Sequence, residues 1–401
     1  MLLAALCIAG CQPSTEGVAQ PYTAEDEALY LKRFEQLFKD APRGEGLGGY
    51  DIVRDVAGAP DAAPLPVAGA EESTISAAAL SDARDYAAAN NSTAFIVWRN
   101  QKLETVDYFG DVARETPLVS RSLAKPLGVI AVARAVQTGY IKSIDQPVAD
   151  FITEWRSTPK ADIKIRYLLD MRSGLLPQAF DVDVDSMLNR AYLHPRHDEI
   201  IINEYPLTHE PGTRYEYSNA NSELVSPLIR RATGMSYADW VSREVLQPLG
   251  ALGGAVWINR EDGVEHAGCC ILLPAETWLR LAILLIQDGV WEGRRLLPEG
   301  FVQAMQTPTP ANPHAGMGVY IAGDYVEWRG AANPEVEIGR AYHSEAYLDP
   351  DLFLFDGNSN QVVFMAPSRN LIALRLGGPP PKSPQWDNAY LPNTLLRGIS
   401  D

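Results

Sequence analysis

Hydrophobic and polar positions recur with two different periods along this chain, and the change of period predicts where helices and strands lie. Residues 76–90 (SAAALSDARDYAAAN) carry small apolar residues at helical spacing and predict a helix. The next two runs, 93–98 (TAFIVW) and 103–110 (LETVDYFG), are rich in β-branched and aromatic residues and predict strands. The short polar stretch 99–102 separates them, so we expect a β-hairpin.

The C-terminal third of the chain returns to strand-like runs. DLFLF (351–355), QVVFMA (361–366) and LIALRLG (371–377) predict three strands, and the turn Pro367–Asn370 separates the last two. Strand signals therefore stand at both ends of the region from 73 onwards, with helical signals between them. We expect one sheet built from both ends, with a helical insertion.

Helical patterns fill the middle of the chain. Four segments carry them: 164–171 (KIRYLLDM), 222–234 (SELVSPLIRRATG), 237–250 (YADWVSREVLQPLG) and 277–289 (TWLRLAILLIQDG). The helix predicted at 222–234 should end at Gly234. A further helix is predicted at 24–38, followed by linkers rich in Gly and Pro.

These patterns divide the chain into four parts. We expect a signal peptide at 1–10 and a lipidated tether with an N-terminal extension at 11–72. An α/β domain should comprise 73–125 and 265–401, and a mostly helical domain should comprise 126–264.

The composition is that of a globular protein. Of the 401 residues, 46% are hydrophobic and 21% are charged, so we expect a full core. The formal net charge of −17 would repel phosphates, which counts against a nucleic-acid partner. The six histidines and four cysteines show no metal-ligand spacing such as CxxC or HExxH. We therefore expect no metal and no cofactor.

The first eleven residues, MLLAALCIAGC, are apolar but too short to cross a bilayer, which takes about twenty residues. They resemble a shortened signal peptide, and residues 8–11 (IAGC) are similar to a bacterial lipobox, in which the cysteine receives lipid. We expect a periplasmic protein attached to a bacterial membrane, in our interpretation the outer one, through lipid on Cys11 alone. No Lys or Arg precedes the apolar run, so we expect the natural start to lie upstream. The alternative is a frayed apolar N-terminus.

With Cys11 lipidated and Cys7 removed, Cys269 and Cys270 are the cysteines that remain. Adjacent cysteines rarely bridge each other, so we expect no disulfide even in an oxidising compartment.

The stretch VSRSLAKPLGVIAVARAV (119–136) places Ser122 and Lys125 three residues apart at the head of an apolar run. A serine hydroxyl is a weak nucleophile and needs a nearby base. At i and i+3 on a helix the two side chains share a face, and burial lowers the pKa of a lysine so that it can accept a proton. Pro126 is tolerated only in a first helical turn. The helix should therefore begin close to Ser122, whose N–H can stabilise an oxyanion.

S-x-x-K alone is weak evidence, because it occurs by chance about once in a chain of this length. It occurs a second time here, as Ser157-Thr158-Pro159-Lys160. That copy lies in a polar segment interrupted by a proline, and we expect nothing to bury its lysine.

A second element strengthens the catalytic interpretation. HEPGTRYEYSNANSELVSPLI (209–229) contains Tyr217-Ser218-Asn219 just before a predicted helix. In an extended segment, residues two apart project to the same side, so the phenol and the amide can point into one cleft. Tyr217 could relay a proton to a leaving group, and Asn219 could hold Lys125 or a substrate carbonyl. Taken alone, this pair favours a buried tyrosine and a helix-capping asparagine.

Together these residues resemble the motifs of the penicillin-recognising serine hydrolases, which include class C-like β-lactamases, DD-peptidases and related esterases and amide hydrolases. The resemblance extends from about residue 73 to the C-terminus. It includes four further stretches: GYIKSIDQPVADFI (139–152), IRYLLDMRSGL (165–175), EPGTRYEYSNA (210–220) and DGVWEGRRLLP (288–298).

The resemblance implies a role for each residue of the two motifs. Ser122 would be the nucleophile, Lys125 its base and Tyr217 a second general base, with Asn219 at the third position of the Tyr-x-Asn motif. The implied fold class is α/β (α+β), β-lactamase/transpeptidase-like: an antiparallel sheet flanked by helices, with a mostly helical domain facing it across a cleft.

The third motif of this family, Lys or His followed by a small or hydroxyl residue and Gly, is absent from the matching strand. Gly357 followed by Pro367 suits the family spacing, which puts Phe355-Asp356-Gly357 at the motif. Phe355 cannot hold a substrate carboxylate, and Asp356, if it points inward, would repel one. The N–H of Asn358 could still serve as a second oxyanion donor.

Other interpretations of the third motif stay open. Asp356-Gly357 could be a plain turn pair at a strand end. His-Ala-Gly triplets also occur at 266–268 and 314–316; we interpret both as chance and keep His314 as the alternative. The sequence does not decide whether Asp356, His343 or Glu345 lines the cleft.

These features predict a serine hydrolase that forms an acyl-enzyme on Ser122, with a small-molecule ester or amide as its partner. Carboxylesterase activity is the first choice, on a neutral or amine-bearing substrate. Hydrolysis of a linear amide, as in the 6-aminohexanoate-dimer hydrolase relatives, comes second, and a β-lactamase third. A non-catalytic envelope binding protein is the rival from another class. An α/β-hydrolase lacks support because the chain has no GxSxG.

Overall fold

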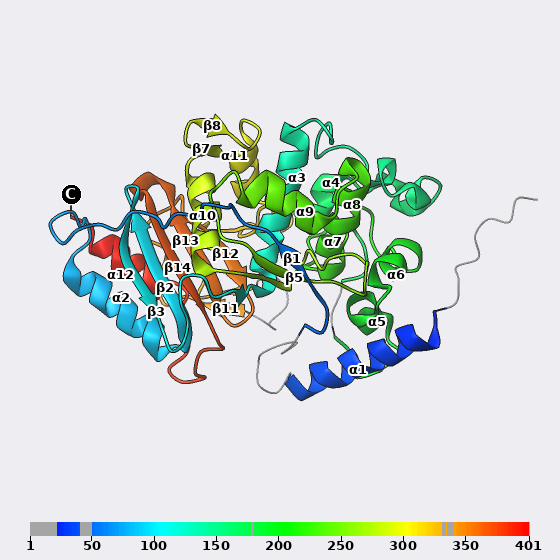
Figure 1. Cartoon of the computed structure of the whole chain (residues 1–401), viewed down its shortest axis with the longest axis horizontal. Coiled ribbons are helices and arrows are strands. Elements are labelled where there is room, and N and C mark those ends of the chain that lie inside the picture. The colour runs from blue at the N-terminus through cyan, green and yellow to red at the C-terminus, as the bar shows by residue number, and fades with distance from the viewer. Residues whose placement is uncertain (1–21, 41–49, 178–179, 331–333, 335–339, 401) are drawn as a thin grey trace, which may run out of the picture.

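The computed structural model describes residues 22–40, 50–177, 180–330, 334 and 340–400. The predicted signal peptide and Cys11 lie outside these residues. Figure 1 shows a sheet covered by helices at one end of the long axis and a helical region at the other. The C-terminus lies beside the sheet, at the opposite end from helix α1.

A six-stranded antiparallel sheet forms the centre of the α/β region. Its strands stand in the order β3-β2-β14-β13-β12-β9, so the N-terminal hairpin pairs directly with the last strand of the chain. The bounds are β2 (Ser92–Arg99), β3 (Lys102–Tyr108), β9 (Tyr320–Ile321), β12 (Phe353–Gly357), β13 (Gln361–Ala366) and β14 (Leu371–Gly377). The predicted hairpin, the three C-terminal strands and the sheet built from both ends of the region are confirmed.

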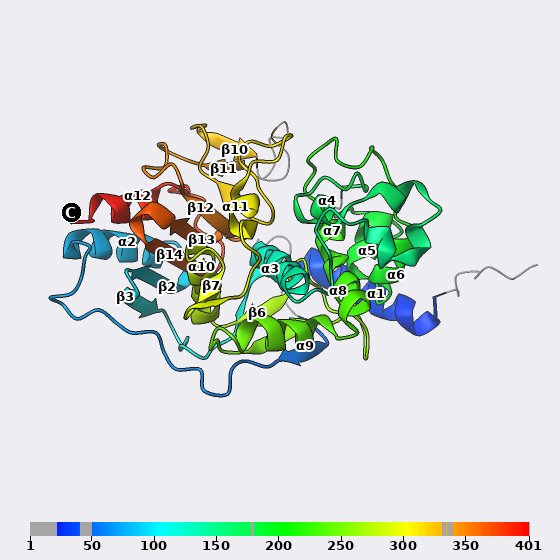
Figure 2. The ribbon, with the colours of Figure 1, turned by 90° about the horizontal axis from the view of Figure 1, so that it is seen from above.

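Helices cover both faces of this sheet, and each face has its own apolar cluster. Helices α2 (Ala77–Ala89) and α12 (Tyr390–Arg397) pack on each other, and α2 lies against β2. Helix α10 (Ala275–Ile286) packs on β13 and β14 from the other side, where the larger core continues into the helical region. Figure 2 shows the sheet between these two layers. The expected α+β architecture, an antiparallel sheet flanked by helices, is confirmed.

The helical region begins with the longest buried helix, α3 (Ala124–Gln137), twelve of whose residues are buried. Six shorter helices follow: α4 (Ile165–Leu169), α5 (Met187–Leu193), α6 (His197–Asn203), α7 (Asn219–Glu223), α8 (Val225–Thr233) and α9 (Tyr237–Val241). Helix α8 ends at Gly234, which has φ 75° and caps the helix as predicted.

A second, four-stranded sheet lies between the two regions. Its strands are β1 (Val53–Val56), β5 (Gly254–Trp257), β6 (Ile271–Leu273) and β4 (Leu118–Val119), in the order β1-β5-β6-β4. The sequence patterns did not predict it, because its strands have only two to four residues and are too short to show a period. Strand β5 lies inside the segment assigned to the helical domain, so that segment is not purely helical.

The N-terminal extension is part of the fold rather than only a tether. Helix α1 (Ala24–Asp40), predicted at 24–38, packs against α5, and β1 pairs with β5. Arg33 on α1 is almost fully buried and donates hydrogen bonds to Asp51 and to the carbonyl oxygens of Leu193 and Asn259. These contacts fix residues 50 and 51 against the helical region.

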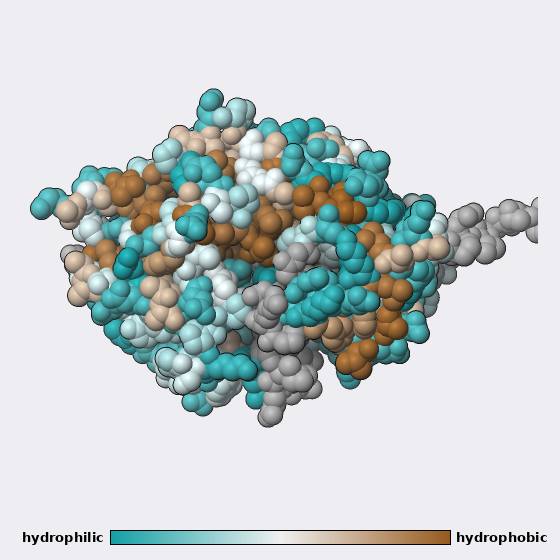
Figure 3. Space-filling model, turned by 60° about the horizontal axis from the view of Figure 1, so that its bottom comes forward, coloured by the Kyte–Doolittle hydropathy of each residue, from teal (hydrophilic) through white to brown (hydrophobic). Residues whose placement is uncertain are grey.

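The remaining elements are short. They are β7 (Val290–Trp291), β8 (Arg294–Arg295), α11 (Phe301–Gln306), β10 (Trp328–Gly330), β11 (Arg340–Tyr342), the π-helical turn Ser242–Leu246, and 3-10 turns that include η2 (Arg121–Leu123), η4 (Thr153–Trp155) and η5 (Pro159–Asp162). None of the helices in the described part of the chain is both long and apolar enough to cross a membrane. Apolar residues reach the surface in separate patches between hydrophilic ones (Figure 3).

The second S-x-x-K copy corrects one expectation. Lys160 is buried, although the polar sequence around it suggested otherwise. Its ammonium donates to the carbonyl oxygens of Ile201 and Ile202 and lies 5.2 Å from the ring centroid of Trp155. Burial lowers the pKa of Lys160 to about 8. The two carbonyl partners stand 41 and 42 residues away in the chain, so a local pattern could not predict them.

Candidate active site

The first motif lies where a strand turns into a helix. Strand β4 leads into η2, which holds Ser122, and α3 follows with Lys125 in its first turn. Pro126 is in the same first turn, as the sequence required. Lys125 is 6% exposed and its Nζ lies 3.0 Å from Ser122 Oγ. The buried α3 therefore holds the amine against the hydroxyl.

The Tyr-x-Asn segment meets this pair at the start of α7. Tyr217 Oη lies 2.6 Å from Ser122 Oγ. Asn219 Oδ1 accepts a hydrogen bond of 2.9 Å from Lys125 Nζ, which also lies 4.7 Å from the Tyr217 ring centroid. The structure thus brings Ser122, Lys125, Tyr217 and Asn219 together across more than ninety residues of sequence.

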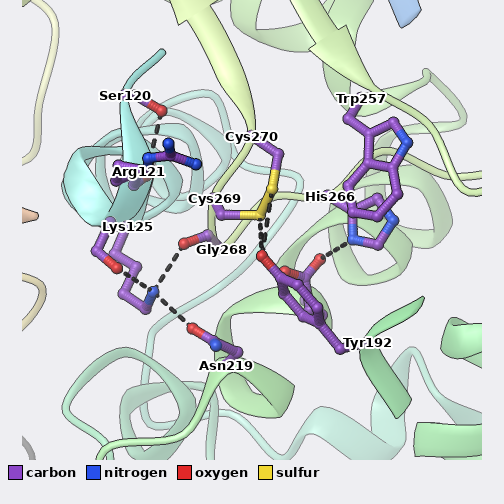
Figure 4. Close-up of a disulfide and its surroundings, with 12 residues drawn as sticks. Ser120, Arg121, Lys125, Tyr192, Asn219, Trp257, His266, Gly268, Cys269 and Cys270 are labelled. Atoms are coloured by element: carbon purple, nitrogen blue, oxygen red, sulfur yellow. Dashed lines mark hydrogen bonds and ion pairs between the residues drawn. A yellow bond between two sulfur atoms is a disulfide. The ribbon is translucent and has the colours of Figure 1, made fainter. Parts of the chain in front are cut away.

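A third acceptor for Lys125 comes from a segment that the motifs did not indicate. The carbonyl oxygen of Gly268 accepts a hydrogen bond of 2.7 Å from Lys125 Nζ (Figure 4). Three residues later β6 begins, and its Ile271 carbonyl accepts from the N–H of Ser120. Residues 268–271 therefore support both the lysine and the turn that carries the serine.

Cys269 and Cys270 in this segment form a disulfide, so the expectation that they do not bridge is wrong. Successive side chains of an extended strand point to opposite faces. Cys270 instead has φ 66°, in the left-handed region, which turns the two side chains toward each other. The hydroxyl of Tyr192 contacts both sulfurs, at 2.6 and 3.3 Å (Figure 4).

The end of β12 runs beside the nucleophile. A Cβ added to Gly357 would lie 3.2 Å from the amide nitrogen of Leu123 and 3.2 Å from the carbonyl oxygen of Ser120. The glycine therefore allows strand and turn to approach closely. Asp356, Gly357 and Asn358 line the same cleft as Ser122, whereas Phe355 is fully buried in the core.

The structure shows where the side chains lie whose positions the sequence left undecided. Asp356 lines the cleft, and burial raises the pKa of its carboxyl to about 7. His343 is buried behind it, with its ring nitrogens 3.1 Å from Tyr347 Oη and 3.2 Å from the Ala341 carbonyl oxygen. His314 lines the same small cavity as His343, and Glu345 pairs with Arg397 at the surface.

The cleft has a volume of about 470 Å³. Besides the predicted residues, it is lined by Tyr50, Arg121, Phe180, Tyr192, Cys269, Tyr320, Arg340, Ala341, Ser359 and Asn360. Sequence reasoning missed these residues. Three of them adjoin predicted site residues in the chain: Arg121 precedes Ser122, and Ser359 and Asn360 follow Asn358. The others reach the cleft through contacts distant in the chain.

Three buried residues form a cluster that the sequence did not show. His197 on α6, Glu223 on α7 and His266 are fully buried and lie within 4.8 Å of one another. The spacing of the histidines along the chain gave no sign of this cluster. Glu223 Oε2 lies 3.6 Å from His197 Nε2 and 3.3 Å from His266 Nδ1.

The ring geometry of this cluster does not suit a metal ion. The two imidazole rings stack with centroids 4.1 Å apart and 12° between their planes. A metal ion bound through a ring nitrogen lies near the plane of that ring, about 2.0–2.1 Å from the nitrogen. Because the two imidazole rings lie in separate, nearly parallel planes, one ion cannot lie near both planes at once. We interpret the cluster as a buried carboxylate packed beside two imidazoles. Glu223 Oε1 lies 2.8 Å from the position of a Cβ at Gly268, so the cluster supports the segment that anchors Lys125.

Comparisons with known proteins agree with the motifs and the fold. Residues 78–268 match the model of the Beta-lactamase family. The 6-aminohexanoate-dimer hydrolase of Paenarthrobacter ureafaciens is 23% identical over 221 residues, which are 53% of this chain and 56% of that protein. The chain thus spans little more than half the length of this curated relative.

Two solved structures show the same fold. A candidate 6-aminohexanoate-dimer hydrolase from Bacillus anthracis superposes with a TM-score of 0.65 at 18% identity, covering 88% of this chain and 90% of that one. EstCE1, a hydrolase with promiscuous acyltransferase activity, superposes with a TM-score of 0.59 at 15% identity, covering 80% of this chain and 98% of that one.

Proposed function

We propose that this chain, which matches the Beta-lactamase family model over residues 78–268, is a serine hydrolase that cleaves an ester or amide through an acyl-enzyme on Ser122. The observation that carries this proposal is the position of Ser122 Oγ, 2.6 Å from Tyr217 Oη and 3.0 Å from Lys125 Nζ. A serine becomes a nucleophile when a group within hydrogen-bond reach can take its proton. Two such groups meet at this hydroxyl.

In the first step Ser122 Oγ bonds to the substrate carbonyl carbon and its proton passes to the Lys125–Tyr217 pair. The bond to the leaving group then breaks, and the same pair protonates the departing alcohol or amine. In the second step a water molecule gives its proton to the pair and attacks the acyl carbon. The acid is released and Ser122 recovers its proton, so the cycle needs no cofactor.

The carbonyl oxygen becomes an oxyanion in both steps and needs donors. We assign this role to the backbone N–H groups of Ser122 and Asn358. The close approach of Gly357 to the 120–123 turn supports the assignment, because it brings the end of β12 to the nucleophile. Asn219 holds Lys125 in place through its side-chain oxygen.

Among the possible reactions, ester hydrolysis comes first, linear amide hydrolysis second and β-lactam hydrolysis third. Phe355 is buried in the core, so the third-motif position offers no cation or hydroxyl for a β-lactam carboxylate. The 6-aminohexanoate-dimer hydrolase among the relatives supports the second choice.

We also propose that the protein is periplasmic and attached to a bacterial membrane through lipid on Cys11. The support is the sequence alone, in the apolar run that ends at Cys11. Metabolic labelling with a fatty-acid probe tests the proposal. Label that is lost in Cys11→Ser supports the anchor, and an unlabelled wild-type protein contradicts it.

The reaction is tested by comparing p-nitrophenyl butyrate with a chromogenic cephalosporin, using soluble protein that lacks residues 1–11. Ester turnover that is lost in Ser122→Ala, with little cephalosporin cleavage, supports the proposal. Efficient cephalosporin cleavage would place the protein with the β-lactamases. Absence of ester, amide and cephalosporin turnover would favour the rival, a non-catalytic envelope binding protein.

A further inference from the structure

A second, small cavity lies beside the nucleophile. It has a volume of about 20 Å³, and Ser122, Lys125, Tyr217 and Asp356 are among the residues that line it. Three of these, Ser122, Tyr217 and Asp356, also line the main cleft, so the two spaces adjoin at the nucleophile. A cavity needs about 10–15 Å³ to hold one water molecule. This cavity can therefore admit water but not the acyl chain of a substrate.

The polar groups of the cavity wall suit a water molecule, which needs about two to four polar partners when it is buried. Lys125 Nζ already has three oxygen atoms within hydrogen-bond distance, so its donors are used. Tyr217 contributes a hydroxyl group to the wall, and so does Tyr320 on β9. Burial, two neighbouring phenols and the Asp356 carboxyl together raise the pKa of Tyr320 well above its ordinary value, so this carboxyl lies near the Tyr320 hydroxyl. When ionised, it is the strongest acceptor on the wall.

The carboxyl group of Asp356 has no other role in the fold. Within the described part of the chain, no N–H or O–H donates a hydrogen bond to it and no cation pairs with it. Burial is the one cause that raises its pKa, to about 7. An unpaired buried carboxyl is unfavourable, and aspartate is depleted in strands. Stability therefore does not explain an aspartate at this end of β12, whereas a role beside the nucleophile does.

We propose that Asp356 holds the hydrolytic water in this small cavity and so positions it to attack the acyl-enzyme. This inference rests on the proposed hydrolase function and deepens its second step. The water oxygen bonds to the acyl carbon, one of its protons passes to the Lys125–Tyr217 pair, and its other O–H donates a hydrogen bond to Asp356. The bond from the acyl carbon to Ser122 Oγ then breaks, Oγ takes the proton back from the pair, and the acid leaves.

This role confines Asp356 to one of the two chemical steps. The attacking atom in the first step is Ser122 Oγ itself, so acylation needs no positioned water. Loss of the Asp356 carboxyl should therefore slow deacylation and leave acylation unchanged. A residue that only supported the shape of the site would slow both steps together.

The test measures the two steps separately with p-nitrophenyl butyrate at pH 8. This ester is uncharged, so the charge of residue 356 has little effect on its binding. The initial burst of p-nitrophenol reports acylation, and mass spectrometry of quenched samples follows the decay of the butyryl-enzyme. In Asp356→Ala the burst should stay within about twofold of wild type, while the decay should be about tenfold slower or more. Asp356→Asn keeps one acceptor oxygen and should slow the decay less.

Two further variants make the result specific. Asp351→Asn changes another partly buried aspartate, which lies outside the cleft, and should leave both rates unchanged. Val319→Ile enlarges an apolar residue of the cavity wall and should slow the decay by displacing the water while Asp356 is intact. If the Asp356 variants do not fold, Val319→Ile decides, and decay at the wild-type rate overturns the inference.

The outcomes separate this inference from the proposed function. A wild-type enzyme that forms no acyl-enzyme overturns the proposed function and the inference with it. An acyl-enzyme that decays equally fast in wild type and Asp356→Ala overturns the inference alone, as does equal slowing of burst and decay. A slower decay behind an unchanged burst supports it.

Discussion

Lys125 Nζ donates a hydrogen bond of 2.7 Å to the carbonyl oxygen of Gly268, the residue that precedes the Cys269–Cys270 disulfide. The candidate base is therefore held from three sides, by Ser122, Asn219 and Gly268. Two of these partners belong to family motifs. The third belongs to a segment whose geometry depends on a disulfide and on a buried carboxylate.

Gly268→Ala should lower kcat about tenfold or more with a smaller change in KM. A Cβ at this position would lie 2.8 Å from Glu223 Oε1 and 2.9 Å from Ser222 Cβ, so the segment must shift and carry its carbonyl away from Lys125. A tenfold loss corresponds to about 1.4 kcal/mol of activation free energy. Gly128→Ala in α3 is the control, because its Cβ would meet only ordinary contacts at 3.6 Å and beyond. Equal activity of the two variants would contradict this role of Gly268.

Reduction of the Cys269–Cys270 disulfide should lower kcat several-fold. The disulfide joins the residue after the Lys125 anchor to the residue before β6, and β6 pairs with the strand that leads to Ser122. Cys269 lines the cleft, so a small phosphine can reach it. In protein lacking residues 1–11 these are the two remaining cysteines, and the thiols released can be counted directly.

The Cys269→Ser, Cys270→Ser variant provides the control for this experiment. It should be slow from the outset and insensitive to the reductant. Full activity in wild-type protein with two titratable thiols would show that the disulfide does not support the site.

Asp356 should make the activity on anionic substrates depend on pH. Its pKa is about 7 in the folded protein, so the carboxyl is neutral below pH 7 and becomes a carboxylate above it. A carboxylate in the cleft repels an anionic substrate, and kcat/KM for such a substrate should fall as pH rises through 7. Asp356→Asn, which keeps the neutral shape, should remove this fall. Identical pH profiles for wild type and variant would exclude Asp356 as the titrating group.

The same carboxyl also affects stability. Because its folded pKa is raised above the ordinary value of 3.8, its stabilising contribution is present at low pH and is lost as pH rises toward 7. Asp356→Asn should therefore be relatively more stable than wild type above pH 7. Chemical denaturation at pH 5 and pH 8.5 measures the difference.

Three buried histidines should make the fold sensitive to acid. Burial lowers the pKa of His194, His266 and His343 to about 4. Between their ordinary pKa of 6.5 and 4, the unfolded chain binds protons that the folded protein does not. The free energy of unfolding should then fall with decreasing pH by up to about 1.4 kcal/mol per pH unit for each histidine. A Tm that stays constant from pH 6.5 to 4 would contradict these shifts, and His343→Asn should reduce the slope.

The sequence was most informative where a local pattern determines structure. The hairpin at 92–108, the strands after Asp351 and the stop of α8 at Gly234 follow from period, composition and turn residues. The pairing of Ser122 with Lys125 follows from helical spacing, and Tyr217 and Asn219 joined them through the family resemblance. Phe355, placed at the third motif by the spacing of Gly357 and Pro367, lies in the core.

Contacts between distant segments were not predictable in this way. Tyr50 in the N-terminal extension and Arg121 in the nucleophile turn line the same cleft, although they stand far apart in the chain. The Cys269–Cys270 disulfide requires a left-handed residue that its sequence did not indicate. The cluster around Glu223 brings together three helix and loop segments whose histidines stand far apart in the chain. In each case tertiary packing, rather than local propensity, places the side chains.

The most direct test of the central claim is to identify the acylated residue. Protein lacking residues 1–11 is mixed with excess p-nitrophenyl butyrate, quenched in acid within the first turnovers and digested for peptide mass spectrometry. The account predicts a butyryl group on Ser122, with no adduct and at least a thousandfold lower turnover in Ser122→Ala. An adduct on another residue, or turnover that persists in Ser122→Ala, would contradict it.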